Sequence, residues 1–208
     1  MLLYCVRHGQ SRYNAEGRIQ GQSDAPLSEL GYRQGAAAAE ALAELPIEAV
    51  YSSPLLRALE TARPIAAALR LPVQSDPRLM ELNAGIFQKQ LRTAMQATYP
   101  EVMACWMRGD LDYAIPGGES RRDLMHRGAA VFRSIYAAGH RQAVVVAHGG
   151  LLVAAFKALL KAGPELHPFS LQNGSITQLE LTADAATLVT INQVDHLQGV
   201  GFGPGGDL

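Results

Sequence analysis

The sequence predicts an α/β fold, a three-layer α/β/α sandwich built on a mainly parallel central sheet. Short apolar runs alternate along the chain with longer helical patterns, as in sheets that carry helices on both faces. The first run, Leu2–Val6, is apolar throughout, which is typical of a strand buried on both faces. In such folds ligands bind beyond the carboxyl ends of the strands. The fold class therefore also predicts where a functional site lies.

The first part of the chain follows this alternation. Ser28 is a typical helix N-cap, and Pro46 is expected to stop the helix that follows it. After the strand Leu2–Val6, the predicted elements are the helix Glu29–Leu45, the strand Ala49–Ser52, the helix Leu55–Arg70 and the strand Val73–Ser75.

The stretch from Gly85 to Gly118 interrupts the alternation. It contains helical patterns over Gln90–Tyr99 and Glu101–Met107, followed by a loop over Gly109–Gly118. We expect an inserted cap, at about residues 86–118, that lies over one end of the sheet.

The alternation resumes after this insertion. The predicted elements are a helix from Ser120 to about Ala138, the strand Ala143–Ala147, the helix Gly150–Leu160, and a hairpin of Ser175–Leu181 with Thr187–Val194. The Gly-rich tail, residues 199–208, is expected to be flexible. We expect residues 1–208 to form a single domain.

The composition excludes several classes of protein. The 208 residues carry 18 basic and 19 acidic side chains, whereas nucleic acid binding needs a surplus of Lys and Arg, so no nucleic acid partner is expected. Cys5 and Cys105 are too few for a disulfide framework, which favours a reducing compartment. The apolar run Met1–Val6 is too short for a signal peptide, and the longest uncharged stretch, Gln142–Phe156, is too short for a membrane span. We expect a cytoplasmic protein without a membrane partner.

Charged and imidazole side chains follow four of the predicted strands. Arg7 and His8 come at the end of the first strand, Arg57 shortly after the second, Glu81 after the third, and His148 directly after Ala143–Ala147. Because the carboxyl ends of parallel strands meet at one edge of the sheet, these side chains are expected to converge. Burying such side chains near a core costs free energy unless they are paired with opposite charges or take part in the function.

Phosphoryl transfer is the chemistry that suits this set. Two arginines can bind the oxygens of a phosphate and stabilise the charge of the transition state. One neutral imidazole can attack phosphorus, and the other can hydrogen-bond a phosphate oxygen. A carboxyl group that is held protonated can give its proton to the leaving group and then accept a proton from water. No cofactor is expected. No metal is expected either, because Asp195-His196 has no third ligand at a suitable spacing.

Six blocks of the sequence resemble, in order, those of the histidine phosphatase superfamily (branch 1), which includes the cofactor-dependent phosphoglycerate mutases. The closest likeness is to the bacterial group of phosphoglycerate mutase-like proteins and broad-specificity phosphatases. The resemblance covers most of the chain, to about residue 200, and these blocks carry it. They are Leu3–Ser11 continuing to Asn14, Arg18–Ser28, Ser52–Ala62, Arg78–Gly85, Pro116–Ser120 and Ala147–Gly150.

The resemblance implies a phosphoglycerate mutase-like fold and a role for each matching residue. His8 is expected to be the nucleophile that forms a phosphohistidine, and Glu81 the proton donor. Arg7, Arg57 and His148 are expected to hold the phosphate. The predicted additional substrate contacts are Asn14, Gln20, Gly21 and Gly149. After Gly85 the chain departs from the family pattern, since the run Ile86–Lys89 stands where an aromatic residue and Glu-Gly are common.

Purely structural roles remain open for several of these residues. Arg57 could form a salt bridge with Glu60, and Glu81 could pair with Arg78. Asn14 and Gln20 could equally well stabilise a loop.

The sequence leaves three functions open. The sequence favours a phosphatase that acts on a small phosphorylated metabolite, with inorganic phosphate or sulfate expected to bind the same site. A mutase of the phosphoglycerate type needs a second anion site, but the insertion offers only Lys89, Arg92 and Arg108 as cations. A catalytically inactive binding protein is disfavoured by the complete set of reactive residues. The oligomeric state is open: dimers are common among proteins of this general type, which makes a homodimer one option, but no segment of the sequence identifies an interface.

Overall fold

A six-stranded mixed sheet forms the centre of the molecule in the computed structural model, which describes residues 1–161 and 170–203. The strand order is β3-β2-β4-β1-β5-β6. The first four of these strands run parallel, whereas β5 pairs antiparallel with β1, and β6 pairs antiparallel with β5. The strands are β1 (Leu2–Arg7), β2 (Ala49–Ser52), β3 (Val73–Ser75), β4 (Gln142–Ala147), β5 (Ile176–Leu181) and β6 (Ala186–Gln193).

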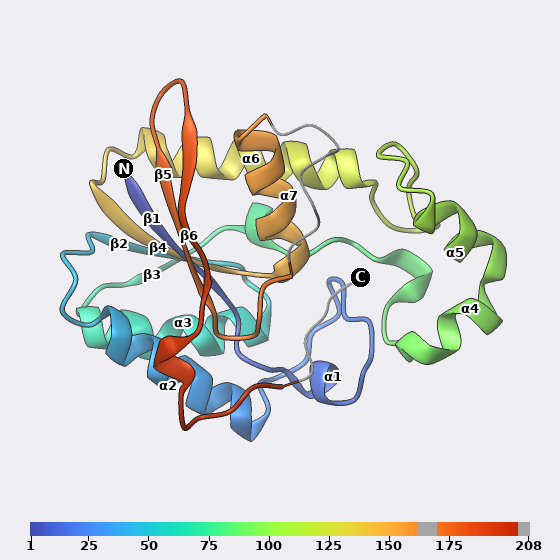
Figure 1. The fold of residues 1–208 in the computed structure, drawn as a ribbon, viewed down its shortest axis with the longest axis horizontal. Helices are drawn as coiled ribbons and strands as arrows, with labels where there is room; N and C mark the ends of the chain where they lie inside the picture. The colour runs from blue at the N-terminus through green and yellow to red at the C-terminus, as the bar shows by residue number, and fades with distance from the viewer. Residues whose placement is uncertain (162–169, 204–208) are drawn as a thin grey trace.

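Helices cover both faces of the sheet (Figure 1), which confirms the predicted three-layer α/β class. Apolar residues of α2 and α3 pack with Tyr4, Val6 and Val144 on one face. Those of α6 and α7 pack with Cys5 and Val145 on the other face. The helices of the sandwich are α2 (Glu29–Leu42), α3 (Leu56–Leu69), α6 (Arg121–Ala137) and α7 (Gly149–Leu159).

The predicted helices of the sandwich are confirmed, with small differences at their ends. Ser28 and Ser120 are N-caps, and each accepts a hydrogen bond from a backbone N–H of the first turn. The helix that begins after Ser28 ends at Leu42, one turn before the expected stop at Pro46. A short helix that the sequence did not predict, α1 (Arg12–Ala15), begins at Ser11 through a capping box with Asn14.

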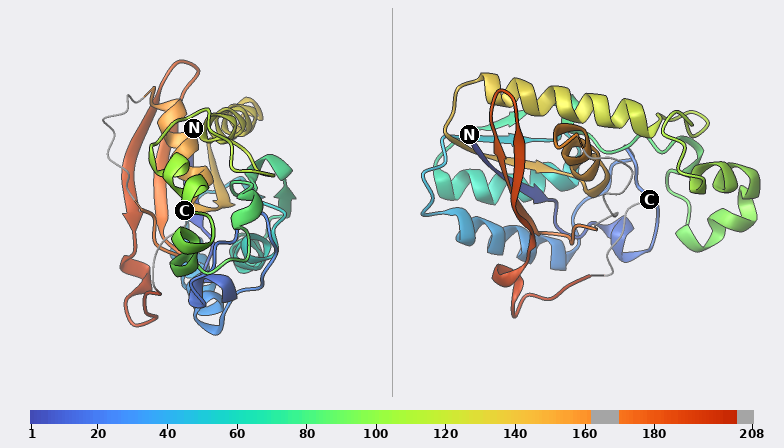
Figure 2. Two further views of the ribbon diagram at one scale, coloured as in Figure 1. Left: turned by 90° about the vertical axis from the view of Figure 1, so that its right-hand side faces the viewer. Right: turned by 45° about the horizontal axis from the view of Figure 1, so that its top comes forward.

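The inserted segment lies beyond one end of the sheet (Figure 1 and the right-hand view of Figure 2). The predicted helix Gln90–Tyr99 is wrong in its first half, because only α4 (Met95–Thr98) is α-helical. The segment before α4 is held by the loop around residue 18, since Ile19 N–H donates to the Gln90 carbonyl and Arg92 N–H donates to the Gly17 carbonyl. The second predicted helix is confirmed as α5 (Pro100–Met107).

The end of the chain follows the predicted hairpin. Residues 199–203 run past α2, where Gln34 Nε2 donates to the Gly201 carbonyl at 3.2 Å. Residues 204–208 of the predicted flexible tail lie outside the described residues. Within the described part of the chain, no helix has the length and apolarity that crossing a membrane requires.

Candidate active site

His8 follows β1, which lies between β4 and β5 in the sheet. The chain turns sharply here and passes very close to α2. A Cβ atom on Gly9 would lie 2.4 Å from the Gly31 carbonyl oxygen, so only glycine fits this position. The Gly9 N–H donates to Thr61 Oγ1 on α3 at 3.0 Å. This packing fixes the backbone beside His8 and leaves its side chain only 1% exposed.

The hydrogen bonds of the His8 ring define its reactive nitrogen. Nδ1 lies 2.7 Å from the Gly9 carbonyl oxygen, and because a carbonyl only accepts, Nδ1 carries the proton. Nε2 of the neutral ring then presents its lone pair. Arg57 Nε donates toward this atom at 3.3 Å, a long contact for a hydrogen bond. The result is an oriented imidazole with a basic nitrogen next to a guanidinium group.

Arg57 is fully buried in the first turn of α3. Its Nη2 donates to the Gly21 carbonyl at 2.8 Å, and its Nη1 donates to the Ser23 carbonyl at 3.0 Å. These contacts direct the guanidinium toward His8. The alternative partner, Glu60, instead accepts hydrogen bonds from the Leu27 N–H and the Tyr32 hydroxyl.

His148 lies beside His8, with ring centroids 5.1 Å apart and ring planes inclined by 60°. Its Nε2 is 2.8 Å from Ser53 Oγ, whereas its buried Nδ1 makes no hydrogen bond with the described residues. Burial lowers the pKa of His148 well below its usual value, and the positive charges of Arg57, Arg7 and Arg127 lower it further. His148 is therefore neutral. If Ser53 donates to Nε2, then Nδ1–H is a donor available to an anion.

Glu81 meets the N-terminal end of α7. Its Oε2 accepts from the Gly150 N–H at 3.0 Å, and its Oε1 accepts from the N–H groups of Leu82 at 2.7 Å and Leu151 at 2.9 Å. A Cβ atom on Gly150 would lie only 2.6 Å from Oε1, so glycine is what allows this approach. Hydrogen bonds from backbone N–H groups, together with the helix dipole, favour the ionised carboxylate. This corrects the expectation from the sequence that the carboxyl group is held protonated.

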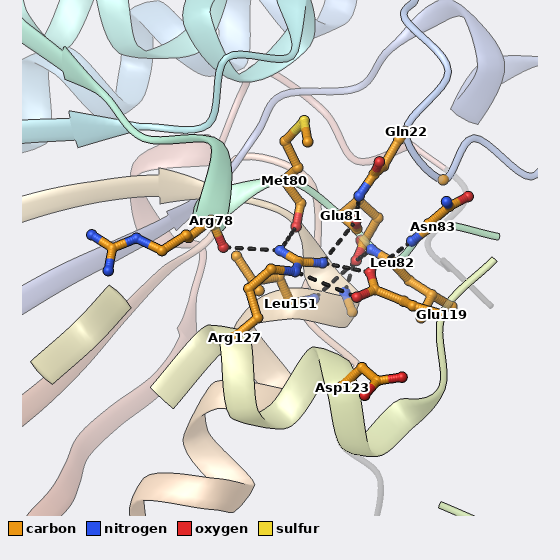
Figure 3. Close-up of polar contacts among 12 residues, drawn as sticks. Gln22, Arg78, Met80, Glu81, Leu82, Asn83, Glu119, Asp123, Arg127 and Leu151 are labelled. Atoms are coloured by element: carbon orange, nitrogen blue, oxygen red, sulfur yellow. Dashed lines mark hydrogen bonds and ion pairs between the residues drawn. The ribbon is translucent and has the colours of Figure 1, made fainter. Parts of the chain in front are cut away.

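Two charged residues hold the segment that carries Glu81 (Figure 3). The Arg127 guanidinium donates to the backbone carbonyls of Arg78 at 2.9 Å, Met80 at 2.6 Å and Glu81 at 3.2 Å. It also pairs with Glu119 at 2.5 Å. The Arg78 side chain is directed away from Glu81 and pairs with Asp76 at 2.7 Å.

A cavity of about 400 Å³ adjoins this cluster. The predicted residues in its lining are Arg7, Gln20, Gly21, Glu81 and Gly149. His8, Arg57 and His148 are not part of the lining and are almost fully buried. Arg7, at the end of β1, is buried as well and donates through Nη1 to the Leu171 carbonyl.

Asn14 and Gln20 both stabilise the loop after β1. Asn14 Oδ1 accepts from the Ser11 N–H at 3.1 Å and from Asn173 Nδ2 at 3.2 Å. Gln20 Oε1 accepts from the Ser11 hydroxyl at 2.6 Å, and Gln20 also lines the cavity. These contacts bear out the loop-stabilising alternative. The substrate contacts of both residues remain a prediction.

Several further residues contribute to the site without a sign in the sequence. Ser53 lies within the block Ser52–Ala62, but the resemblance implies no role for it. Arg121, Arg127 and Lys157 lie inside helical patterns that show no local sign of a site. Among the described residues, no three His, Cys, Asp or Glu side chains are grouped so that they could hold a metal ion. Independence from added metal remains a prediction.

Comparisons with known proteins point to one family. Residues 3–194 match the family model for the histidine phosphatase superfamily (branch 1). The glucosyl-3-phosphoglycerate phosphatase of Mycolicibacterium vanbaalenii is 40% identical over 166 residues, which are 76% of this chain and 73% of that protein. A Proteus mirabilis protein named "Probable phosphoglycerate mutase GpmB" is 37% identical over 148 residues, which are 71% of this chain and 69% of that protein.

A solved structure is also similar along nearly the whole chain. It is the mycobacterial glucosyl-3-phosphoglycerate phosphatase in complex with VO3, with a TM-score of 0.85 and 36% sequence identity. The similarity covers 92% of this chain and 98% of that chain. The fold is thus shared with a solved phosphatase over 92% of this chain.

Proposed function

The chain belongs to branch 1 of the histidine phosphatase superfamily, and from this we propose that it hydrolyses small phosphorylated metabolites by passing the phosphoryl group through His8. The phosphatase activity is supported by the named phosphatases among its relatives. The single observation that carries the role of His8 is its ring geometry. Nδ1 is bound to the Gly9 carbonyl, so Nε2 faces Arg57 as the attacking atom.

In the first step, the Nε2 lone pair of His8 attacks phosphorus, and the bond between phosphorus and the ester oxygen breaks. Arg57 and Arg7 stabilise the charge on the phosphoryl oxygens, and His148 donates through Nδ1–H to one of them. The product of this step is a phosphohistidine and an alcohol. The neutral state of His148, caused by its burial, leaves Nδ1–H as a donor without adding a positive charge next to His8.

Glu81 donates a proton in the first step and accepts one in the second. Because three backbone N–H groups favour its ionised form, it must first receive the proton that it gives to the leaving oxygen. The monoanion of a phosphate ester carries such a proton, since its second ionisation occurs near pH 6. In the second step the Glu81 carboxylate removes a proton from the water that attacks the phosphohistidine, and this step releases inorganic phosphate and free His8.

The inserted segment forms part of the proposed substrate site. Arg92, Trp106 and Leu111, which all lie within residues 86–118, line the cavity together with Glu81. We propose that this segment acts as a cap within a single domain and determines which metabolite fits. Inorganic phosphate, as the product, is expected to bind the same site.

Two further properties belong to this proposal. Cys5 and Cys105 are both free thiols, which is consistent with a protein that works in the cytoplasm. A homodimer is one option that the sequence leaves open, and the mass of the protein in solution tests it.

A mutase is the second candidate. A relative carries that name, and the cavity contains Arg121 and Lys157, which do not belong to the inserted segment. These cations offer a place for a second anion that the inserted segment alone does not provide. The two activities are separated by measuring free phosphate and isomerised ester in the same reaction. We expect free phosphate to dominate, and isomer formed without phosphate release would favour the mutase.

The test of the proposed mechanism is the variant His8→Ala. We expect it to have no turnover with a phosphate ester, whereas the matched control His126→Gln, at an exposed position on α6, should retain full activity. Rapid quenching of the wild type with labelled ester should trap phosphate that is stable in base and labile in acid. Turnover by His8→Ala, or a label that survives acid, would require a different nucleophile.

A further inference from the structure

An arginine lies flat against a tryptophan in the wall of the cavity. The guanidinium carbon of Arg121 is 3.4 Å from the centre of the Trp106 ring, and Arg121 Nη1 donates to the Trp106 carbonyl at 3.0 Å. Trp106 comes from α5 of the inserted segment and is buried, whereas Arg121 begins α6. Stacking on the indole covers a face of the guanidinium and fixes its plane, while its N–H groups point outward in that plane.

The Arg121 guanidinium has a positive charge that no carboxylate in the described part of the chain neutralises. No ion pair of Arg121 occurs among the described residues. Burial lowers the pKa of Arg121, but a guanidinium stays charged at any physiological pH. A partly buried cation without an acidic partner is unfavourable unless an anion binds to it.

A second cation lines the same cavity from α7, the helix that packs against α6. Lys157 lies on α7, is partly buried, and also forms no ion pair with the described residues. Among the described residues that line the cavity, Glu81 is the sole acid. Its carboxylate is already bound by the backbone N–H groups at the start of α7. The cavity wall is therefore cationic beyond the phosphate-binding residues.

We propose that Arg121 and Lys157 bind a carboxylate of the substrate, so that the substrate class is a phosphate monoester that also carries a carboxylate. This inference rests on the proposed phosphatase function. The planar fork of a guanidinium matches the two oxygens of a carboxylate. Apolar side chains of Leu124, Met125 and Val153 share the lining, and such surroundings make a singly charged carboxylate less costly to bind than a second, doubly charged phosphate.

The test uses pairs of esters that differ in one charge. One pair is 3-phosphoglycerate and glycerol 3-phosphate, and a longer pair is 4-carboxyphenyl phosphate and 4-carbamoylphenyl phosphate. In the wild type we expect kcat/KM to favour the carboxylate in at least one pair by roughly tenfold to a hundredfold, the usual range for a charged hydrogen-bonded contact. In Arg121→Gln this ratio should fall close to one, because kcat/KM should fall far more for the ester with a carboxylate than for the ester without one.

Two further variants complete the experiment. Arg122→Gln removes the neighbouring arginine, which pairs with Asp112 at the surface, and should leave the ratio unchanged. Lys157→Gln should lower the ratio by itself, so the proposal does not depend on one variant folding correctly.

The outcomes separate this inference from the proposed function. Equal rates within each pair for the wild type, or a preference that survives both Arg121→Gln and Lys157→Gln, would overturn the carboxylate site while leaving the phosphatase intact. A preference for a bisphosphate over every carboxylate would also overturn it. Absence of hydrolysis for all four esters would overturn the phosphatase function and this inference together.

Discussion

Replacement of Arg127 by alanine is expected to destabilise the protein strongly. Arg127 joins α6 to the segment around Met80 through hydrogen bonds to the carbonyls of Arg78, Met80 and Glu81 (Figure 3). Its ion pair with Glu119 is mostly shielded from solvent, since the two side chains are 20% and 17% exposed. Glu119 in turn accepts from the Asn83 N–H at 2.8 Å.

The size of the effect follows from what Arg127→Ala leaves behind. The Glu119 carboxylate loses its cation, and the carbonyl groups lose a charged donor. Breaking a buried ion pair by removing one partner costs about 3–5 kcal/mol, and partial exposure reduces this, so we expect a loss of about 3 kcal/mol in the free energy of unfolding. For a chain of this length, 3 kcal/mol corresponds to a decrease in Tm of roughly 6–12 °C.

Urea unfolding of matched variants provides the assay. Arg122→Ala on the same helix removes an ion pair with Asp112 whose side chains are 46% and 66% exposed, and such surface pairs contribute about 0–1 kcal/mol. A loss of less than about 1 kcal/mol for Arg127→Ala, or equal losses for both variants, would refute the reasoning. The folded fraction of Arg127→Ala should also turn over more slowly, because Glu81 loses its backbone support.

Two other predictions concern proton transfer and pH. Glu81→Gln should lose about 10²–10⁴-fold in kcat on alkyl phosphates and much less on esters with good leaving groups, and a comparison of alkyl and nitrophenyl esters measures this; equal losses on both would argue against a proton donor. His148 has a lowered pKa in the folded protein, so between the unfolded value of about 6.5 and the lower folded value only the unfolded chain takes up its proton. Stability should thus decrease as the pH falls below about 6.5, by up to about 1.4 kcal/mol per pH unit from this group. Urea titrations at several pH values should show a shallower decrease for His148→Gln, and identical slopes would contradict the assignment.

The regular part of the fold was predictable because its signals are local. The apolar runs of β1 and β4 are buried on both faces, and Ser28 and Ser120 cap their helices as expected. The helix predicted over Gln90–Tyr99 failed because local propensity competed with long-range pairing. The residues around Leu91 hydrogen-bond to the loop at Arg18, and a sequence window contains no information about that partner.

The approximate position of the cluster also came from the sequence. His8 and His148 each follow a strand, and those strands are neighbours and parallel, so their carboxyl ends had to lie together. The resemblance of the sequence blocks to the histidine phosphatase superfamily supplied the role expected of each residue. The orientation of the rings was not predictable, since it depends on the Gly9 carbonyl and on Ser53, which approaches from the end of β2.

By itself, the sequence determined the fold class, the family, and the strand ends where reactive side chains gather, because these follow from patterns within single elements. Only the tertiary structure decided that Arg127 and Glu119 hold the segment of Glu81, and that Arg121, Trp106 and Lys157 share one cavity. These residues lie on different helices and loops. Their distances depend on how α5, α6 and α7 pack against each other, and side-chain packing between distant segments leaves no periodic trace in the chain.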